Sequence, residues 1–279
     1  MSVLELVAIL AAGFAAGVIN TIVGSGSLIT FPTLLVLGIP PLTANVSNNI
    51  GLVPGGVSGA LGYRPEMRGH SRALLRFVPI SLVGSVIGAS LLLVLPAAAF
   101  KAIVPVLILL ALVLVLAGPQ LQRRGAARRA RELAPQAAGA DPSNASDAVS
   151  LADEAPVGRG RLAAVSVGVL VAGMYGGYFG AAQGVLLMGI FSALLTDPIQ
   201  RLNGYKNVLA LVVNAVAALT FVLFARDSID WRVVLLIGVG SLLGGVVGAR
   251  VGRRIPAGVL RGLIIFIGVV AIVKLVFFP

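Results

Sequence analysis

The chain contains no cysteine and only one histidine among its 279 residues. Without cysteine it can form no disulfide, no thiolate metal site and no thiol nucleophile. The single histidine, His70, lies in an arginine-rich stretch, so a histidine-based metal centre or catalytic triad is excluded as well. We therefore expect no metal, no other cofactor and no enzymatic activity.

Charge is also scarce. Charged residues make up 11% of the chain, whereas an average globular domain is about a quarter charged. Hydrophobic residues make up 58%, the mean hydropathy is +1.04, and Lys101 is the only charged residue between Phe77 and Gln120. This composition excludes an ordinary soluble domain and predicts an all-α polytopic membrane protein.

Each half of the chain contains five apolar segments. Those of the first half are residues 3–23, 26–38, 44–63, 73–95 and 98–117, and those of the second half are residues 162–181, 184–196, 204–225, 233–249 and 259–277. A helix needs about 20 apolar residues to cross a bilayer, so most of these segments are long enough. The first one contains Glu5 and lacks a basic start, so we do not expect a cleaved signal peptide.

Two segments, 26–38 and 184–196, are too short for an ordinary crossing. Each follows a glycine-rich break, at residues 24–26 and at residues 176–180. Irregular backbone at membrane depth is tolerated only where protein or a water-filled cavity surrounds it. The pattern therefore predicts broken or re-entrant helices.

The two halves repeat one another. Matching positions recur in register, with Gly17 and Gly24 on Gly173 and Gly180, Ser47-Asn48 on Lys206-Asn207, and residues 84–101 on residues 244–261. Because each half has an odd number of segments, we expect two inverted repeats, a recurrent plan of secondary transporters. The predicted units are a first membrane repeat (1–117), a linker (118–161) and a second membrane repeat (162–279).

Lysine and arginine predict the orientation. If every segment crosses the membrane, the basic loops and the linker lie on one side, which should be cytoplasmic, and both termini lie in the periplasm. Only four of the 21 basic residues would then lie outside, namely Lys101, Arg226, Arg232 and Lys274. The net charge of +11 thus reports topology and gives no reason to expect a nucleic acid partner.

The linker has two parts. Residues 121–133 can form a basic amphipathic helix that could lie on anionic lipid. The rest is rich in Ala, Ser, Asp and Pro and has too few apolar residues to fold. We expect a flexible, basic cytoplasmic tether between the halves.

Polar residues inside membrane segments are costly, so they are the candidates for a binding site. They gather at the two breaks and at the start of the segment after each short one. The candidate substrate-binding residues are Asn20, Thr21, Ser25, Ser27, Asn45, Ser47, Asn48, Tyr178, Gln183, Lys206 and Asn207, and the same groups also include Thr43, Asn49, Tyr175, Asn203 and Asn214.

The chemistry of this set favours a small anion. Backbone N–H groups at the starts of half-helices attract anions, hydroxyls and amides add neutral donors, and Lys206 adds a positive charge. A cation site would show carboxylates, which these segments lack beyond Glu5. Two other interpretations stay open: Lys206 could snorkel to the interface, and residues 45–49 could serve capping and inter-helix hydrogen bonds.

Glycines also recur every four residues, at 51, 55 and 59, at 176, 180 and 184, and at 240, 244, 248 and 252. In lipid this spacing lets helix backbones approach closely. For the last run, packing is the predicted role.

The first half contains Gly17, Gly24-Ser-Gly26-Ser-Leu and Pro32, then Leu-Gly-Ile-Pro-Pro before Ala44-Asn, and Ser58-Gly59 with Tyr63. In this pattern the sequence resembles the first repeat of the sulfite exporter TauE/SafE family, and residues 168–262 resemble its second repeat. The resemblance implies a bacterial inner-membrane permease for small sulfur-containing anions such as sulfite or organosulfonates, often acting in export. The serines at 25 and 27 and the pair Ala181-Ala182 depart from the family's glycine-richer breaks.

The leading hypothesis is therefore export of a small anion by alternating access. Proton-coupled anion uptake and a non-transporting membrane scaffold that uses the linker for docking are the alternatives. The expected partners are the anionic substrate and the lipid bilayer. The sequence leaves open whether the unit is a monomer or a homodimer.

Overall fold

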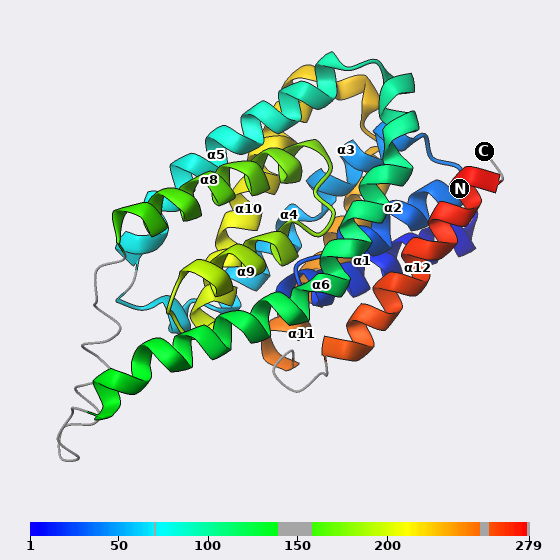
Figure 1. Ribbon diagram of the computed structural model, residues 1–279. Helices are drawn as coiled ribbons and strands as arrows, with labels where there is room; N and C mark the ends of the chain where they lie inside the picture. Colours follow the sequence, from blue (N-terminus) through cyan, green and yellow to red (C-terminus); the bar gives the residue numbers. More distant parts are fainter. Residues whose placement is uncertain (70, 139–157, 252–256, 278–279) are drawn as a thin grey trace.

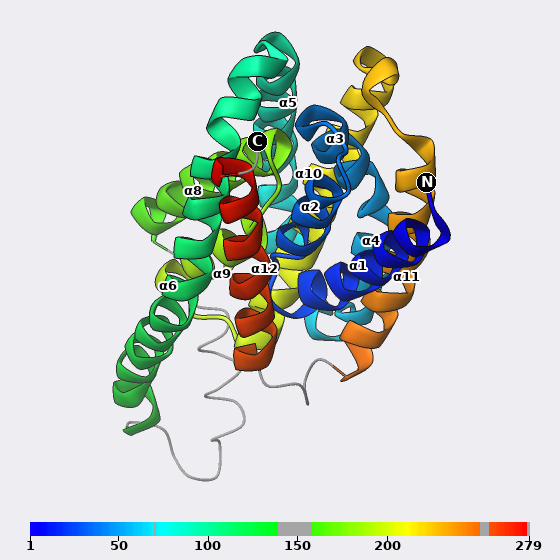
Figure 2. The same ribbon diagram turned by 90° about the vertical axis from the view of Figure 1, so that its right-hand side faces the viewer.

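In the computed structural model the chain is a bundle of helices (Figures 1 and 2). The structure describes residues 1–69, 71–138, 158–251 and 257–277, and no strand occurs in these ranges. Six helices there are long and apolar enough to cross a membrane. The prediction of an all-α polytopic membrane protein is confirmed.

The first half consists of α1 (Val3–Ile22), α2 (Ser27–Val36), α3 (Pro41–Gly51), α4 (Val53–Gly62), α5 (Ser71–Val94) and α6 (Ala97–Ala138). The second half consists of α8 (Arg159–Tyr178), α9 (Gln183–Leu194), α10 (Ile199–Phe224), α11 (Trp231–Val251) and α12 (Ala257–Phe277). Three-residue 3-10 turns, Pro65–Met67 and Arg226–Ser228, precede α5 and α11.

The halves are joined by a reciprocal exchange of helices. The first helix of each half packs along the last but one of the other, as α1 on α11 and α8 on α5. In the same way α6 packs on α9, and α12 packs on α2. A two-fold relation between the halves would give this pattern, and the inverted sense of that relation stays a prediction.

Glycines make the α1–α11 and α5–α8 contacts possible. A Cβ added to Gly17 would lie 2.3 Å from the Ser241 carbonyl oxygen, and one added to Gly244 would lie 2.0 Å from the Phe14 carbonyl oxygen. On the other pair, a Cβ on Gly88 would lie 2.0 Å from the Met174 carbonyl oxygen. The glycine run that ends α11 therefore serves close backbone packing, as predicted.

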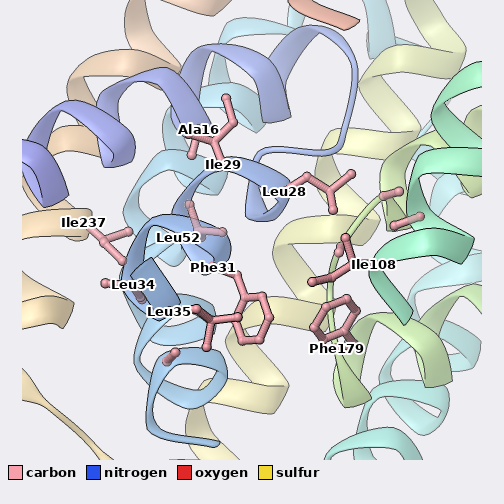
Figure 3. Packing of buried hydrophobic residues seen from close by; sticks show 14 of the residues in the cluster. Ala16, Leu28, Ile29, Phe31, Leu34, Leu35, Leu52, Ile108, Phe179 and Ile237 are labelled. Atoms are coloured by element: carbon pink, nitrogen blue, oxygen red, sulfur yellow. The ribbon is translucent and has the colours of Figure 1, made fainter. Parts of the chain in front are cut away.

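Each short helix folds back on the long helix before it. In the first hairpin (α1 and α2) Ile29 lies next to Ala16, and a Cβ on Gly26 would lie 2.3 Å from the Ala16 carbonyl oxygen (Figure 3). In the second hairpin (α8 and α9) a Cβ on Gly168 would lie 2.9 Å from Ile190. The predicted short helices, broken or re-entrant, are thus present after each break.

The predicted segment 44–63 is two helices rather than one. It divides at Leu52, between α3 and α4, and Pro54 stands in the first turn of α4. Proline has no N–H for the preceding helical turn and clashes with its carbonyl, so the helix breaks there. The corresponding helix of the second half, α10, runs unbroken over 26 residues.

Residues 121–133 of the predicted linker are helical, as expected, but they belong to a longer helical stretch that covers residues 118–138. These residues continue α6, which is 42 residues long and thus about 63 Å. Close packing on α9 accounts for this, because a Cβ on Gly125 would lie 2.0 Å from the Ser192 carbonyl oxygen. Residues 139–157 lie outside the described ranges. The start of α1 and the end of α12 lie at the same end of the molecule in Figure 1, but Figure 2 shows them apart. The periplasmic placement of the termini stays a prediction.

Candidate functional site

The breaks of the two hairpins meet inside the bundle. Gly24 has a φ of +90°, which favours glycine, and its carbonyl accepts a hydrogen bond from the Gly184 N–H at 3.0 Å. A Cβ on either glycine would lie 2.5 Å from the Cα of the other. Phe31 of α2 packs edge-on against Phe179 of the second break, with ring centroids 5.1 Å apart (Figure 3). Residues far apart in sequence thus form one polar region within apolar packing.

At the first break, α10 supplies donors to the end of α1. The last carbonyls of a helix have no partner within it and carry partial negative charge. The Lys206 ammonium donates to the carbonyls of Asn20 and Thr21, both at 3.0 Å. The Asn207 amide donates to the Thr21 carbonyl at 3.2 Å. A cation therefore lies where the helix end is most negative.

Lys206 is completely buried, with 0% of its surface exposed. The snorkelling interpretation is therefore wrong. It assumed that the segment starts at residue 204, but α10 begins at Ile199 after Pro198. Lys206 consequently lies about 10 Å into the helix, and its ammonium points to α1 instead of the interface.

Asn20 and Thr21 also act through their side chains. The Asn20 amide oxygen accepts the Gly26 N–H at 2.8 Å, so this side chain bridges the break to the start of α2. The Thr21 hydroxyl donates to the Gly17 carbonyl one turn earlier, at 2.9 Å. Four predicted residues, the two of α1 with Lys206 and Asn207, form one hydrogen-bonded group.

At the second break, α3 supplies a donor to the end of α8, as α10 supplies donors to the end of α1. The Asn45 amide donates to the Tyr178 carbonyl at 2.9 Å, and the Asn49 amide donates to the Asn45 carbonyl at 3.0 Å. The Asn48 amide oxygen accepts the hydroxyl of Thr30 from α2. The interpretation of residues 45–49 as inter-helix hydrogen bonding is thus correct for part of the patch, and Thr30 is a residue that the sequence analysis missed.

Several polar atoms near the breaks are buried and lack a hydrogen-bond partner among the described residues. They are Ser25 Oγ, Asn48 Nδ2, Asn49 Oδ1, Tyr175 OH and Gln183 Nε2. Unpaired buried polar groups are costly, so each needs an explanation. Most of these atoms are donors, so an acceptor bound beside them would pair them.

Three predicted residues are placed differently. The Ser47 hydroxyl accepts the Asp230 N–H at 2.9 Å, before α11, and thus binds away from the breaks. The Tyr178 ring packs against Phe100 of α6 with centroids 5.8 Å apart, so only its carbonyl joins the site. Ser27 is buried, and its hydroxyl faces the second break although the residue follows the first. The hydroxyl oxygen lies 3.7 Å from the position that a Cβ on Gly180 would take.

Acidic residues stay outside this region. Those that the structure describes lie in a first helical turn, in a connection or in the extension of α6, at Glu5, Glu66, Glu132, Asp197, Asp227 and Asp230. Within the described ranges no three His, Cys, Asp or Glu residues gather to hold a metal ion. Lys206 is also the only buried member of the Asp, Glu, Lys and Arg residues described. The region is cationic overall.

The chain is similar to proteins of several bacteria. It is 27% identical to the "Probable membrane transporter protein ORF9" of Sinorhizobium sp over 96% of this chain and 91% of that protein. A "Probable membrane transporter protein" of Haemophilus influenzae is 26% identical over 98% and 96% of the two chains. Escherichia coli YfcA, named a probable membrane transporter protein, is 24% identical over 94% and 86%.

No solved structure matches the chain. The model of one protein family, described as sulfite exporter TauE/SafE, matches residues 9–275 and so includes both hairpins, both breaks and Lys206. That range is nearly the whole sequence, which establishes the relationship. The chain belongs to the sulfite exporter TauE/SafE family.

Proposed function

We propose that this multi-pass membrane transporter is a permease that exports small sulfur-containing anions, such as sulfite or an organosulfonate, by alternating access. Membership of the TauE/SafE family supports transport, and the family description supports the substrate class. The proposed setting is the bacterial inner membrane, with the basic loops in the cytoplasm and both termini in the periplasm.

The observation that carries the proposal is the environment of Lys206. Its ammonium is fully buried and hydrogen-bonded to two neutral carbonyls, and no carboxylate of the described residues bonds to it. A buried charge is costly unless a partner compensates it, and helix-end carbonyls compensate only in part. An entering anion would provide the missing negative charge, so Lys206 favours anions over neutral solutes and cations.

Neutral donors of both hairpins would complete the site. Ser25 comes from the first break, Gln183 from the start of α9, and Asn48 from α3, each with a buried unpaired donor atom. Donors from two hairpins can close around one oxyanion. The contact between Gly24 and Gly184 lies where the hairpins would separate when the site opens to one side.

The membrane potential supports the direction of transport. Moving one charge through 100 mV is worth about 2.3 kcal/mol. Because the cell interior is negative, the exit of an anion is downhill, and a dianion gains about twice as much. No coupling ion is needed for export, whereas accumulation of the anion would need one.

Flux in proteoliposomes tests the proposal. We would measure radiolabelled sulfite and a small sulfonate under an imposed voltage without a pH gradient, for the wild type, Lys206→Gln and the control Lys101→Gln. Lys101 is an exposed lysine of α6. We expect Lys206→Gln to lower the apparent affinity at least about tenfold, because it removes a charged hydrogen-bond donor, and the control to match the wild type.

Other results would decide against the proposal. Equal affinity in Lys206→Gln and the wild type would remove Lys206 from the substrate site. Flux that needs a proton gradient would favour proton-coupled uptake. Absence of flux for every anion tried, in protein that melts cooperatively, would favour a scaffold.

A further inference from the structure

The hydroxyl of Thr30 on α2 bonds to another helix. A threonine inside a helix commonly donates its hydroxyl to a carbonyl one turn earlier in the same helix. Thr33, also on α2, donates in this way to the Ile29 carbonyl at 2.8 Å. Thr30 donates instead to the side-chain oxygen of Asn48 on α3. This bond joins the first hairpin to the helix that follows it.

The bond decides how the Asn48 amide is oriented. Both side chains are buried, with Thr30 1% and Asn48 0% exposed. An amide has an oxygen that accepts hydrogen bonds and an NH2 group that donates them, and the Thr30 hydroxyl holds the oxygen. Asn48 Nδ2 has no hydrogen-bond partner in the described part of the chain. The bond to Thr30 therefore leaves a donor, and not an acceptor, free for a bound group.

Asn48 holds the place in α3 that Lys206 holds in α10. Each helix begins after a proline, Pro40 or Pro198, with ψ angles of 141° and 143°, and each of the two residues lies eight positions after its proline. In both helices the next residue is an asparagine whose amide donates to a carbonyl one turn earlier at 3.0 Å, namely Asn49 and Asn207. The helix starts thus match Asn48 with Lys206, whereas the sequence match had paired Ser47 with it.

The chemistry of these two side chains explains why only one of them needs an orienting partner. A lysine ammonium presents N–H donors whichever way it turns, whereas an amide presents them on one side only. Thr30 is the fourth residue of α2, and the fourth residue of α9 is Leu186, whose side chain forms no hydrogen bond. The half of the chain with the amide therefore has a hydroxyl at this place, and the half with the ammonium has an apolar side chain.

We propose that Thr30 is a positioning residue for the transported anion. Its bond to the Asn48 oxygen keeps Asn48 Nδ2 free to donate to the anion, so that α3 contributes a neutral donor at the place where α10 contributes Lys206. The inference rests on the proposed function, because it takes Asn48 as a substrate contact. Thr30 acts through Asn48 and does not touch the anion itself.

Flux of radiolabelled sulfite and a small sulfonate in proteoliposomes tests this role, with KM and the maximal rate measured separately. Thr30→Val removes the hydroxyl, Thr30→Ser keeps it, and the control Thr33→Val removes a hydroxyl that bonds within α2. We expect Thr30→Val to raise KM about five- to tenfold with little change in maximal rate, because one oriented donor is lost. Thr30→Ser and Thr33→Val should stay within about twofold of the wild type.

An Asn48→Ala background shows whether Thr30 acts through Asn48. There Thr30→Val should raise KM no further, because the amide that Thr30 orients is gone. A further rise of the same size would overturn the inference. If Thr30→Val does not fold, Thr30→Ala removes the hydroxyl without placing a methyl group against the Asn48 oxygen, and the same comparisons apply.

The outcomes separate this inference from the proposed function. Wild-type flux with an unchanged KM in Thr30→Val would overturn the inference and leave the permease in place. An equal rise of KM in Thr30→Ser or Thr33→Val would also overturn it, because altered packing of α2 would then explain the effect. Absence of flux in the wild type would overturn the proposed function, and this inference with it.

Discussion

The two re-entrant hairpins share one construction and differ in charge. In each, a break of four residues ends a 20-residue helix and exposes its last carbonyls. The helix after the other hairpin supplies the donors, α10 for α1 and α3 for α8. The donors at α1 are the Lys206 ammonium and the Asn207 amide, whereas the donor at α8 is the amide of Asn45 alone among the described residues.

This difference in charge gives the two hairpins different roles in the proposed function. Amide donors at the second break hold a helix end without attracting charge, so that hairpin can act as a frame. In the proposed function, the ammonium at the first break would exchange helix carbonyls for an anion. Within the ranges described, the one buried cationic side chain, Lys206, therefore lies in the second half of the chain.

Replacement of the positive-φ glycine at each break by alanine gives the largest expected difference in stability between the two hairpins. Gly24→Ala would place a methyl 2.5 Å from backbone, whereas Gly180→Ala would place it 3.0 Å from the Asn49 side-chain oxygen, which can move. Both residues have positive φ and share that strain. We expect Gly24→Ala to cost about 3 kcal/mol or more and to abolish transport, and Gly180→Ala to cost about 1–2 kcal/mol.

Thermal melting in detergent with parallel flux assays would measure both. Equal melting temperatures for the two variants would show that the hairpins do not rely on close contact at Gly24.

Removal of one amide donor from each helix end gives a smaller effect. Asn45→Ala leaves the Tyr178 carbonyl without its described partner, and we expect it to cost about 1–3 kcal/mol. Asn207→Ala leaves the Thr21 carbonyl bound to Lys206, and we expect about 1 kcal/mol. Denaturant titration of the folded protein checks the order, and a larger cost for Asn207→Ala would reverse our assignment of the frame.

The smallest effect concerns Ala182, which caps α9 with a φ of 60°. The first break has no such strained residue, because its positive φ falls on glycine. We expect Ala182→Gly to stabilise by about 0.5 kcal/mol, as relief of the strain slightly exceeds the added chain entropy. Ala181→Gly, at a buried neighbour without positive φ, is the control and should destabilise the protein. If both variants lower the melting temperature, Ala182 is not strained.

Much of this arrangement could be predicted from sequence, because bilayer thickness fixes segment length and glycine marks the breaks. Residues on one helix face could also be predicted. Asn45, Asn48 and Asn49 are three and four residues apart and share a face, while Ser47 lies on another, in agreement with its bond to the Asp230 N–H. Helical period alone therefore could have removed Ser47 from the site.

Other features depend on tertiary contacts that no local pattern reports. Gly118-Pro119 reads as the end of a helix, yet α6 continues to Ala138 because its extension docks on α9. The burial of Lys206 follows from where α10 starts and from the end of α1 beside it, a residue pair separated by most of the chain. Spacing within a segment cannot show such a meeting.

The reciprocal exchange of helices has a consequence for how the protein is made. The glycine face of α1 packs on α11, whose Ile237 lies over Gly13. At about 5–20 residues per second, that face waits roughly 10–40 s on the ribosome for its partner. Neither half can finish its packing first, so the two halves form a single unit of biogenesis, in which the last helices to be synthesised complete the first.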